Sequence, residues 1–342
     1  MAAIADKMNG RDKKRITFVY FSPNSSFIPS FVERDYRILS NHFECSMVSY
    51  RKLIDTIKIF KSILFSKASI SWFAGGHAFL SVVISRILRK KSIIIIGGYE
   101  VASEAEIGYG LFLMPWHKRV TTLIAIKYAD MVLPVSEFTS RETLRRIRPR
   151  KMQIIYNGVN EERFKPGTSG KEEDLVITVA IIDRSNLKRK GLLTLVKAAA
   201  LIPEARFAII GMERDESADH LKSISPQNVL FPGFVSNDAL IEWYQRAKVY
   251  VQISAYESFG VSLAEAMLCE CVPVVTKSGA LPEVVGETGF YVAYDDERDV
   301  AEGIKKALKS EKGALARERV SACFSDKKRE RELVSVIGEL IL

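Results

Sequence analysis

The stretch that decides the fold spans residues 256–267 and reads YESFGVSLAEAM, with two glutamates eight positions apart. Before it, the β-branched run 249–253 predicts a buried strand. The run 261–268 that follows combines strong helix formers with one apolar face and predicts a helix. Glu257 is therefore expected on a loop at the carboxyl end of a strand, which is where open α/β sheets bind ligands.

The start of the predicted helix suits an anion. Phe259, Gly260 and Val261 would carry free backbone N–H groups at the positive end of the helix dipole, which favours a diphosphate. At about 1.5 Å per residue, Glu257 and Glu265 are expected roughly 10–12 Å apart along the helix. One carboxylate at each end of a nucleotide sugar fits this spacing, with Glu257 near the sugar and Glu265 near the ribose. The alternative is a pair of solvated surface acids.

Composition indicates a folded protein of two domains. The chain has 342 residues, of which 47% are hydrophobic and 27% charged. Its four cysteines show no repeated paired spacing and are expected as buried thiols in a reducing compartment. Residues 1–15 are polar and unlike a signal peptide, and no apolar run is long enough to cross a bilayer. We expect a cytoplasmic protein, soluble or peripheral at the inner face of a membrane.

Charge is unevenly distributed. Residues 1–165 hold 27 Lys and Arg against 14 Asp and Glu, a net +13, and the remainder has a net −4. The first half is therefore expected to face an anionic partner. Within it, residues 51–65 form a basic amphipathic segment that could lie on an anionic membrane. The alternative is a helix packed on the sheet with its lysines in solvent.

Short apolar strands alternate with helices along both halves, which predicts an α/β fold with parallel sheets and right-handed crossovers, twice over. The polar, Pro- and Gly-containing segment 160–174 reads as a linker, and Ser136 is expected to cap a helix. The domains are placed at 1–165 and 175–325. Predicted strands are 15–21, 93–96, 131–136, 152–158, 175–182, 206–210, 249–253 and 272–276; predicted helices include 192–202, 238–247 and 299–308.

Two basic residues flank the turn that follows the first strand of the second half. Arg184 and Lys190 could neutralise a diphosphate leaving group without a metal, although basic loops are usually only solvated. Gly211 ends the next strand and permits close approach of the backbone to a base or ribose. Val235, in the segment 231–235, could contribute to a base-binding edge.

Together these residues resemble the family 4 glycosyltransferases, the retaining GT-B group, over roughly residues 92–295. The motif match consists of Glu257, Phe259, Gly260, Glu265, Ala266 and Met267. Further matches are 273–275, 283–285, 289–290, and Arg184 followed six positions later by Lys190-Gly191.

The resemblance implies two Rossmann-like domains facing a cleft. The second would hold a nucleotide-diphosphate sugar, the first most of the acceptor site, and residues 326–342 would cross back to the first. Arg184 and Lys190 would hold the diphosphate. Glu257 would bond the sugar hydroxyls and Glu265 the ribose. Gly260 and its neighbours would offer amides, while Gly211 and Val235 would line the base pocket. No cofactor or metal is implied, and the leaving diphosphate would accept the acceptor's proton on the same face.

The sequence departs from the family where many members carry a histidine near the reacting sugar. Here the loop contains Tyr99 and Glu100, and His77 lies in a separate first-domain loop. We expect Glu100 to take the catalytic role, with Tyr99 and His77 as alternatives. The family's glycine after Ala-Met is also missing, and Cys269-Glu270 follows Leu268 instead.

The sequence therefore predicts a retaining, metal-independent glycosyltransferase using a UDP- or GDP-sugar. Its acceptor would be a hydroxyl on a sugar, a lipid-linked molecule or a cell-surface glycan precursor, and an anionic membrane surface could be a further partner. Nucleic acid is not an expected partner. The alternatives are a GT-B sugar-nucleotide epimerase and a non-catalytic sugar-nucleotide-binding protein.

Overall fold

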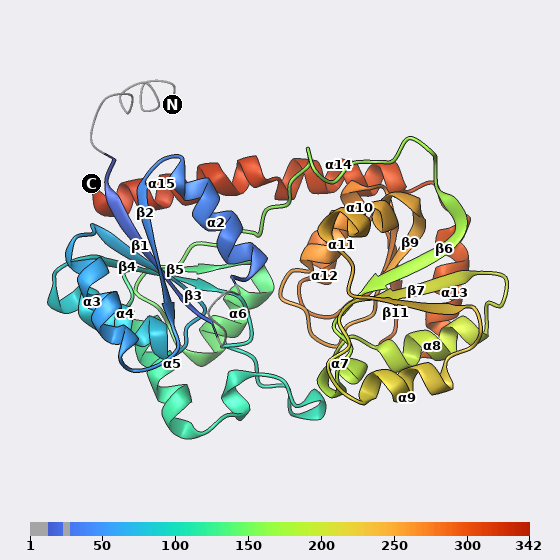
Figure 1. The fold of residues 1–342 in the computed structure, drawn as a ribbon, viewed down its shortest axis with the longest axis horizontal. Helices are drawn as coiled ribbons and strands as arrows, with labels where there is room; N and C mark the ends of the chain where they lie inside the picture. Colours follow the sequence, from blue (N-terminus) through green and yellow to red (C-terminus); the bar gives the residue numbers. More distant parts are fainter. Residues whose placement is uncertain (1–12, 23–27) are drawn as a thin grey trace. The chain divides into compact units, whose positions relative to one another are not determined.

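The computed structural model describes residues 13–22 and 28–342, which form two compact units. The first unit consists of the described residues up to Ser103, together with Gly110–Ile155 and Arg329–Leu342. The second consists of Glu104–Tyr109 and Tyr156–Lys328. Each unit contains one parallel sheet with helices on its faces (Figure 1).

The first unit is built on a five-stranded parallel sheet of order β2-β1-β3-β4-β5. Its strands are β1 (Arg15–Phe21), β2 (Glu44–Tyr50), β3 (Ala68–Trp72), β4 (Lys91–Ile96) and β5 (Met131–Pro134). Its helices are α2 (Ser30–Ser40), α3 (Asp55–Leu64), α4 (Gly76–Ile87), α5 (Trp116–Tyr128), α6 (Glu137–Arg146) and most of α15 (Asp326–Ile341), with a 3₁₀ turn η3 (Leu111–Leu113).

The second unit is built on a six-stranded parallel sheet of order β11-β10-β9-β6-β7-β8. Its strands are β6 (Glu172–Val179), β7 (Arg206–Ile210), β8 (Val229–Gly233), β9 (Ala247–Gln252), β10 (Val272–Thr276) and β11 (Phe290–Val292). Its helices are α7 (Arg184–Arg189), α8 (Leu192–Ala200), α9 (Ser217–Ile224), α10 (Asn237–Arg246), α11 (Val261–Leu268), α12 (Leu281–Val285), α13 (Glu297–Leu308) and α14 (Gly313–Phe324), with a 3₁₀ turn η2 (Ala105–Ile107).

The order of the second sheet fixes the position of its ligand site. The first strand, β6, has β7 on one side and β9 on the other, so the chain runs in opposite directions across the sheet from that point. Such a switch point opens a crevice at the carboxyl ends of the two central strands. The segments that follow β6 and β9 carry Lys190 and Glu257 respectively.

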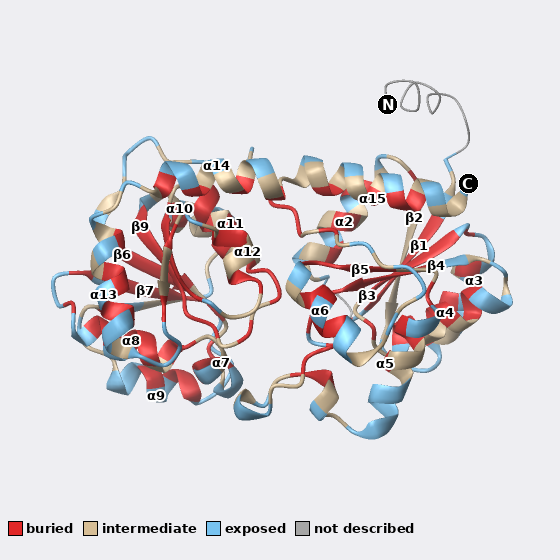
Figure 2. Ribbon diagram, turned by 180° about the vertical axis from the view of Figure 1, so that it is seen from behind, coloured by how far each residue is buried: buried red, intermediate tan, exposed pale blue. Residues whose placement is uncertain are grey.

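Burial follows the layers within each unit. The central strands are almost wholly buried, whereas the helices alternate buried and exposed residues (Figure 2). The last four residues of β4, Ile93–Ile96, form a continuous apolar run because helices cover both faces of a parallel sheet. Cys269 and Cys271 are buried free thiols, as expected, while Cys45 and Cys323 are only partly buried.

Most predicted elements are confirmed, with two corrections. Ser136 caps α6, because its hydroxyl accepts a hydrogen bond from the backbone N–H of Thr139 at 3.1 Å. The segment 152–158, predicted as a strand, is extended but pairs with β5 through only a few bonds, such as that from the N–H of Ile155 to the carbonyl of Pro134 at 3.0 Å. The strand predicted at 175–182 begins earlier, at Glu172, within the predicted linker.

A buried ion pair fixes the last helix to the first unit. Arg329 on α15 donates to Asp35 on α2 at 2.6 and 2.7 Å, and both side chains are almost fully buried. The indole N–H of Trp72 donates to the same carboxylate at 2.9 Å, and Arg329 also donates to the carbonyl of Ile155 at 3.1 Å. Removing either ion alone would leave an uncompensated buried charge, which is strongly destabilising.

Candidate functional site

The centre of the candidate site is an ion pair between the segments that follow β6 and β9. The ammonium of Lys190 lies 2.5 Å from a carboxylate oxygen of Glu257. The two side chains are 19% and 14% exposed, so both are largely removed from solvent but still accessible. Lys190 ends the short helix α7, and Glu257 lies on the loop before α11. The pair thus joins the segments that follow the two central strands, where the strand order reverses.

The Glu257 carboxylate has a second partner in Gln252, the last residue of β9. The amide of Gln252 donates to the same oxygen at 2.7 Å. Burial alone would raise the pKa of Glu257, but the charges of Lys190 and Arg189 outweigh it and keep that pKa below its ordinary value. Glu257 is therefore an anion at neutral pH, with two cationic neighbours.

Helix α11 begins beside this pair. Gly260 is its N-cap, with a left-handed φ of 90° that a side chain would strain, and the N–H groups of Val261–Leu263 have no acceptor within the helix. The opposite end is neutralised by two cations. Arg317 donates to the carbonyl of Leu268, and Lys171 donates to that of Cys269 at 2.6 Å. The helix therefore presents its positive end to the site and has its negative end compensated.

The loop after β10 closes against Glu257. A Cβ on Gly279 would lie 2.1 Å from the backbone oxygen of Glu257, and Gly279 has φ of 62°, so only glycine fits there. The next residue, Ala280, donates its N–H to that oxygen at 2.8 Å. This contact anchors the Glu257 backbone, so the carboxylate projects from a fixed loop.

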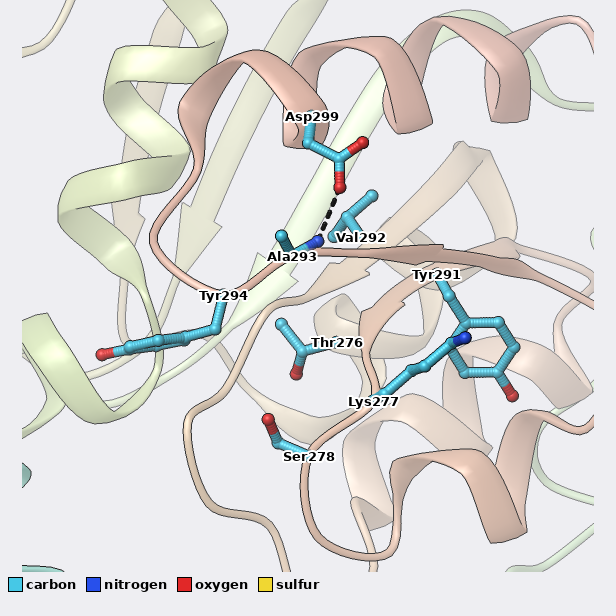
Figure 3. Close-up of a pocket in the computed structure, with 8 residues that line it drawn as sticks. All are labelled: Thr276, Lys277, Ser278, Tyr291, Val292, Ala293, Tyr294 and Asp299. Atoms are coloured by element: carbon cyan, nitrogen blue, oxygen red, sulfur yellow. Dashed lines mark hydrogen bonds between the residues drawn. The ribbon is translucent and has the colours of Figure 1, made fainter.

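Beside that loop is a pocket of about 400 Å³ at the carboxyl ends of β10 and β11. Figure 3 shows Asp299 receiving a hydrogen bond from the N–H of Ala293, at 2.6 Å, and Lys277 beside the ring of Tyr291. The pocket is lined by Thr276, Lys277, Ser278, Tyr291, Val292, Ala293, Tyr294 and Asp299. None of these residues was predicted from the sequence.

The remaining predicted donor-site residues lie at the same edge of the second sheet, but in differing environments. Arg184 is the exposed first residue of α7, and its N–H donates to Asp215 at 3.1 Å. Gly211 follows β7. A Cβ there would lie 1.9 Å from the carbonyl oxygen of Ala180, which follows β6, so only glycine fits at position 211. Val235 follows β8 and is partly buried.

Two predicted residues of the motif have buried neighbours. The ring of Phe259 packs in the core against Phe324, with centroids 5.4 Å apart, so only its backbone is available to a ligand. Glu265 lies within α11 and is partly buried. Its carboxylate accepts a hydrogen bond from the buried Tyr244 hydroxyl at 3.4 Å.

In the first unit, the loop expected to supply a catalytic group is arranged differently from the prediction. Glu100 is buried, and its carboxylate accepts backbone N–H bonds from Gly97 at 2.9 Å, Gly98 at 2.8 Å and Ala74 at 3.4 Å. This geometry holds the turn after β4 rather than presenting a carboxylate to a ligand. We therefore replace the expected catalytic role of Glu100 with a structural one.

The two alternatives to Glu100 also differ in exposure. His77 is buried, its ring nitrogen lies 2.7 Å from the carbonyl of Trp72, and burial lowers its pKa to about 4. It is thus a neutral core residue. Tyr99 is 39% exposed, so it is the candidate of the three that a ligand can reach.

Sequence reasoning missed three residues that shape the pair. Gln252 could have been found as a lone polar residue in an otherwise apolar strand. Gly279 follows a strand end, as functional glycines often do, but nothing local distinguishes it. Arg189 was hidden among four basic residues of one short segment, and only the fold selects it as a neighbour of Glu257.

Two further features of the described part of the chain, 13–22 and 28–342, bear on function. No three His, Cys, Asp or Glu side chains there gather in a way that could hold a metal ion. No helix in those ranges is long and apolar enough to cross a membrane.

Comparisons with known proteins agree on one family. Residues 159–322 match the family model described as "Glycosyl transferases group 1". The chain is 29% identical to N-acetyl-alpha-D-glucosaminyl L-malate synthase of Bacillus anthracis, over 59% of this chain and 58% of that protein. It is 25% identical to alpha-maltose-1-phosphate synthase of Mycolicibacterium smegmatis, over 66% of this chain and 63% of that protein. The aligned parts span about half the length of the curated relatives.

Among solved structures, the Anabaena protein HepE in complex with UDP and glucose superposes with a TM-score of 0.77. The superposition covers 94% of this chain and 99% of that one at 15% identity. At this identity the likeness concerns the fold alone, and it confirms the predicted α/β GT-B architecture of two Rossmann-like domains.

The buried carboxyl of Glu100 generates a prediction about stability. Burial raises its pKa to about 7 against an ordinary 4.5, despite the backbone bonds that oppose the shift. Between these values the folded protein binds a proton that the unfolded chain has released, so stability falls as pH rises from about 4.5 to 7. The shift corresponds to roughly 3 kcal/mol.

Because His77 titrates in the opposite sense between about pH 4 and 6.5, the measurement is the difference between wild type and Glu100→Gln. The free energy of denaturant unfolding should be compared at pH 4.5, 6 and 7.5. The advantage of wild type over the variant should shrink by roughly 3 kcal/mol across this range. A difference that does not vary with pH would show that Glu100 titrates normally in the folded protein.

Proposed function

We propose that this chain, whose residues 159–322 match the group 1 glycosyltransferases, moves a sugar from a nucleotide-diphosphate donor to a hydroxyl acceptor, with retention and without a metal. The observation that carries the proposal is the Lys190–Glu257 pair, seated at the switch point of the second sheet beside the start of α11. A cation, an anion and free helix amides at one place match the diphosphate and the sugar of such a donor.

The leaving diphosphate is held by Lys190, by the N–H groups at the start of α11, and by Arg184. Arg184 is the first residue of α7 and is exposed. Charge develops on the diphosphate as the bond to the anomeric carbon breaks. Fixed donors in a partly dry crevice stabilise that charge more in the transition state than in the ground state, and each is worth several kcal/mol. These groups supply the positive charge that a divalent ion supplies in other transferases.

The sugar and the ribose are held by carboxylates. When the diphosphate takes Lys190, one oxygen of Glu257 loses its ion-pair partner and becomes available to donor-sugar hydroxyls, while Gln252 still orients it. Glu265, in the second turn of α11, bonds the ribose. Gly211 and Val235 line the base, for which UDP and GDP are the first candidates.

Retention follows if the acceptor attacks from the face that the diphosphate leaves. The bond from the anomeric carbon to the diphosphate oxygen breaks, the bond to the acceptor oxygen forms, and the acceptor's proton passes to the leaving diphosphate. No protein base is required, which suits a site whose one central carboxylate is held as an anion by two cations.

For the acceptor, we propose a lipid-linked molecule at an anionic membrane. Helix α3 buries Ile59 and Ile63 against the sheet, as a packed helix would, yet the surrounding segment exposes many large apolar side chains. The exposed set is Leu53, Ile54, Ile57, Phe60, Leu64 and Phe65, of which Leu53 is 79% and Phe65 69% exposed. Lys52 and Lys61 are exposed in the same segment. Apolar and basic side chains interleaved in this way suit an anionic bilayer surface.

The proposal is tested first by donor screening. UDP-, GDP-, ADP- and dTDP-sugars are titrated calorimetrically, and the best donor is assayed with lipid-linked and free sugar acceptors. NMR of the product reports the anomeric configuration, and the assay is repeated in excess EDTA. An inverted product, or activity lost with EDTA and restored by magnesium, contradicts the stereochemistry or the metal independence. Turnover of the donor without transfer would favour an epimerase, and binding without turnover a non-catalytic protein.

Lys190→Ala should reduce turnover strongly, and denaturant unfolding of the variant separates that loss from the destabilisation that an unpaired Glu257 causes. Loss of one charge-assisted contact to the leaving group raises the barrier by about 2–4 kcal/mol, or roughly 30- to 1000-fold in kcat. Lys188→Ala, two residues earlier on the exposed face of α7, is the matched control and should retain wild-type rates. If both variants turn over like wild type, Lys190 does not contact the diphosphate.

Membrane binding should depend on the exposed part of the α3 segment. Exchanging Lys52 and Lys61 for Gln, or Phe60 and Phe65 for Ser, should each weaken sedimentation with anionic liposomes at low salt, because each cation near the surface adds about 1 kcal/mol. Binding of wild type should also fade as salt rises.

The matched control exchanges two exposed lysines of the second unit, Lys306 and Lys309, for Gln, which alters net charge equally. Equal weakening by the control would mean that total charge drives binding rather than the α3 surface. Absence of any liposome association at low ionic strength would point to a soluble acceptor.

A further inference from the structure

The segment Glu104–Tyr109 contributes to the second unit although it precedes that unit in the sequence by some fifty residues. It lies between β4 and α5 of the first unit and contains the 3₁₀ turn η2. Two backbone bonds close it into a loop: the N–H of Glu104 donates to the carbonyl of Tyr109 at 2.8 Å, and the N–H of Tyr109 donates back at 3.0 Å. The loop is thus a preformed unit that presents the Tyr109 side chain.

The ring of Tyr109 has two neighbours from the site. The guanidinium of Arg189 lies over it, 4.8 Å from its centroid, and the ring of Tyr256 lies 5.2 Å away. Arg189 is the residue before Lys190, and Tyr256 is the residue before Glu257. Tyr109 therefore contacts the chain neighbour of each member of the central ion pair.

Arg189 is held from its other side as well. Its guanidinium donates to the side-chain oxygen of Asn186 at 2.6 and 3.1 Å. The amide of Asn186 in turn donates to the carbonyl of Ile181 at 2.9 Å. The carbonyl of Arg189 accepts the N–H of Ala255 at 2.8 Å, which ties α7 to the loop that carries Glu257.

A mobile arginine at this position would compete with Lys190. A guanidinium binds carboxylates in a planar, bidentate manner that an ammonium cannot, and it is less strongly hydrated. Stacking on a tyrosine ring stabilises a guanidinium by about as much as a partly exposed ion pair does. The stack, together with the two bonds to Asn186, therefore competes with Glu257 for the arginine.

We propose that Tyr109 is a positioning residue of the donor site, acting by holding Arg189 on its ring so that Glu257 pairs with Lys190 alone. The expected effect on donor binding rests on the proposed function. A sugar donor can displace one ammonium from Glu257 and use it for the diphosphate, whereas a bidentate arginine on the same carboxylate would block the sugar hydroxyls. A loop from before the second unit in sequence thus takes part in setting up the donor site.

The test compares Tyr109→Ala with Tyr109→Phe, which keeps the ring and removes only the hydroxyl. With the donor identified by screening, Tyr109→Ala should lose about tenfold in kcat/KM for that donor, and Tyr109→Phe should match wild type. The loss in Tyr109→Ala should vanish when Arg189→Met is the background, since the competing charge is then absent. The same loss in both backgrounds, or a loss in Tyr109→Phe, overturns the proposal.

A second readout does not need activity. Hydrogen exchange of the amides over 184–191 should be faster in Tyr109→Ala than in wild type, and unchanged in Tyr109→Phe, because the stack restrains the end of α7. If wild type neither binds nor transfers from any donor, the proposed function fails while this comparison still tests the contact. Unchanged exchange in Tyr109→Ala overturns the positioning role whatever the activity.

Discussion

The arrangement of the second unit depends on one contact, the ion pair between Lys190 and Glu257. It joins the segments that follow the two central strands, and it is formed where little water reaches either charge. Leaving one member unpaired there would be costly, so the short helix α7 and the loop before α11 must be placed together. Gln252 at the end of β9 and Ala280 in the loop after β10 serve the same end, because each bonds to Glu257.

The same contact explains how a site can be stable when empty and receptive when a donor arrives. Two opposite charges that satisfy each other need no ligand to keep the crevice folded. A nucleotide-diphosphate sugar brings an anion for the cation and hydroxyl donors for the anion, so its binding exchanges one set of partners for another. Helix α11 adds a fixed positive end. Lys171 and Arg317 bond to the carbonyls at its other end and stabilise the negative end of the dipole.

The first unit uses buried polar groups for a different purpose. Glu100 and His77 were natural candidates for chemistry, yet both are enclosed and bonded to backbone groups, and Glu100 holds the turn after β4. The Asp35–Arg329 pair is also buried, and it fixes the last helix to this unit by joining two side chains. The feature of this unit that we assign to binding is the exposed apolar and basic surface of the α3 segment. The opposite face of the same helix packs into the core.

The sequence by itself determined the alternation of strands and helices, the two-domain α/β class and the resemblance to one family, because strand and helix periodicities and the motif around Glu257 are local properties. It also placed Lys190 and Glu257 at strand ends. It could not show that they pair, since that requires β6 and β9 to be neighbours although about seventy residues separate them. Tertiary structure alone distinguished Arg189 from the other cations of its segment, buried Glu100, and brought Tyr109 to the second unit. Each of these outcomes depends on which distant backbone lies beside the residue, and no local pattern records that.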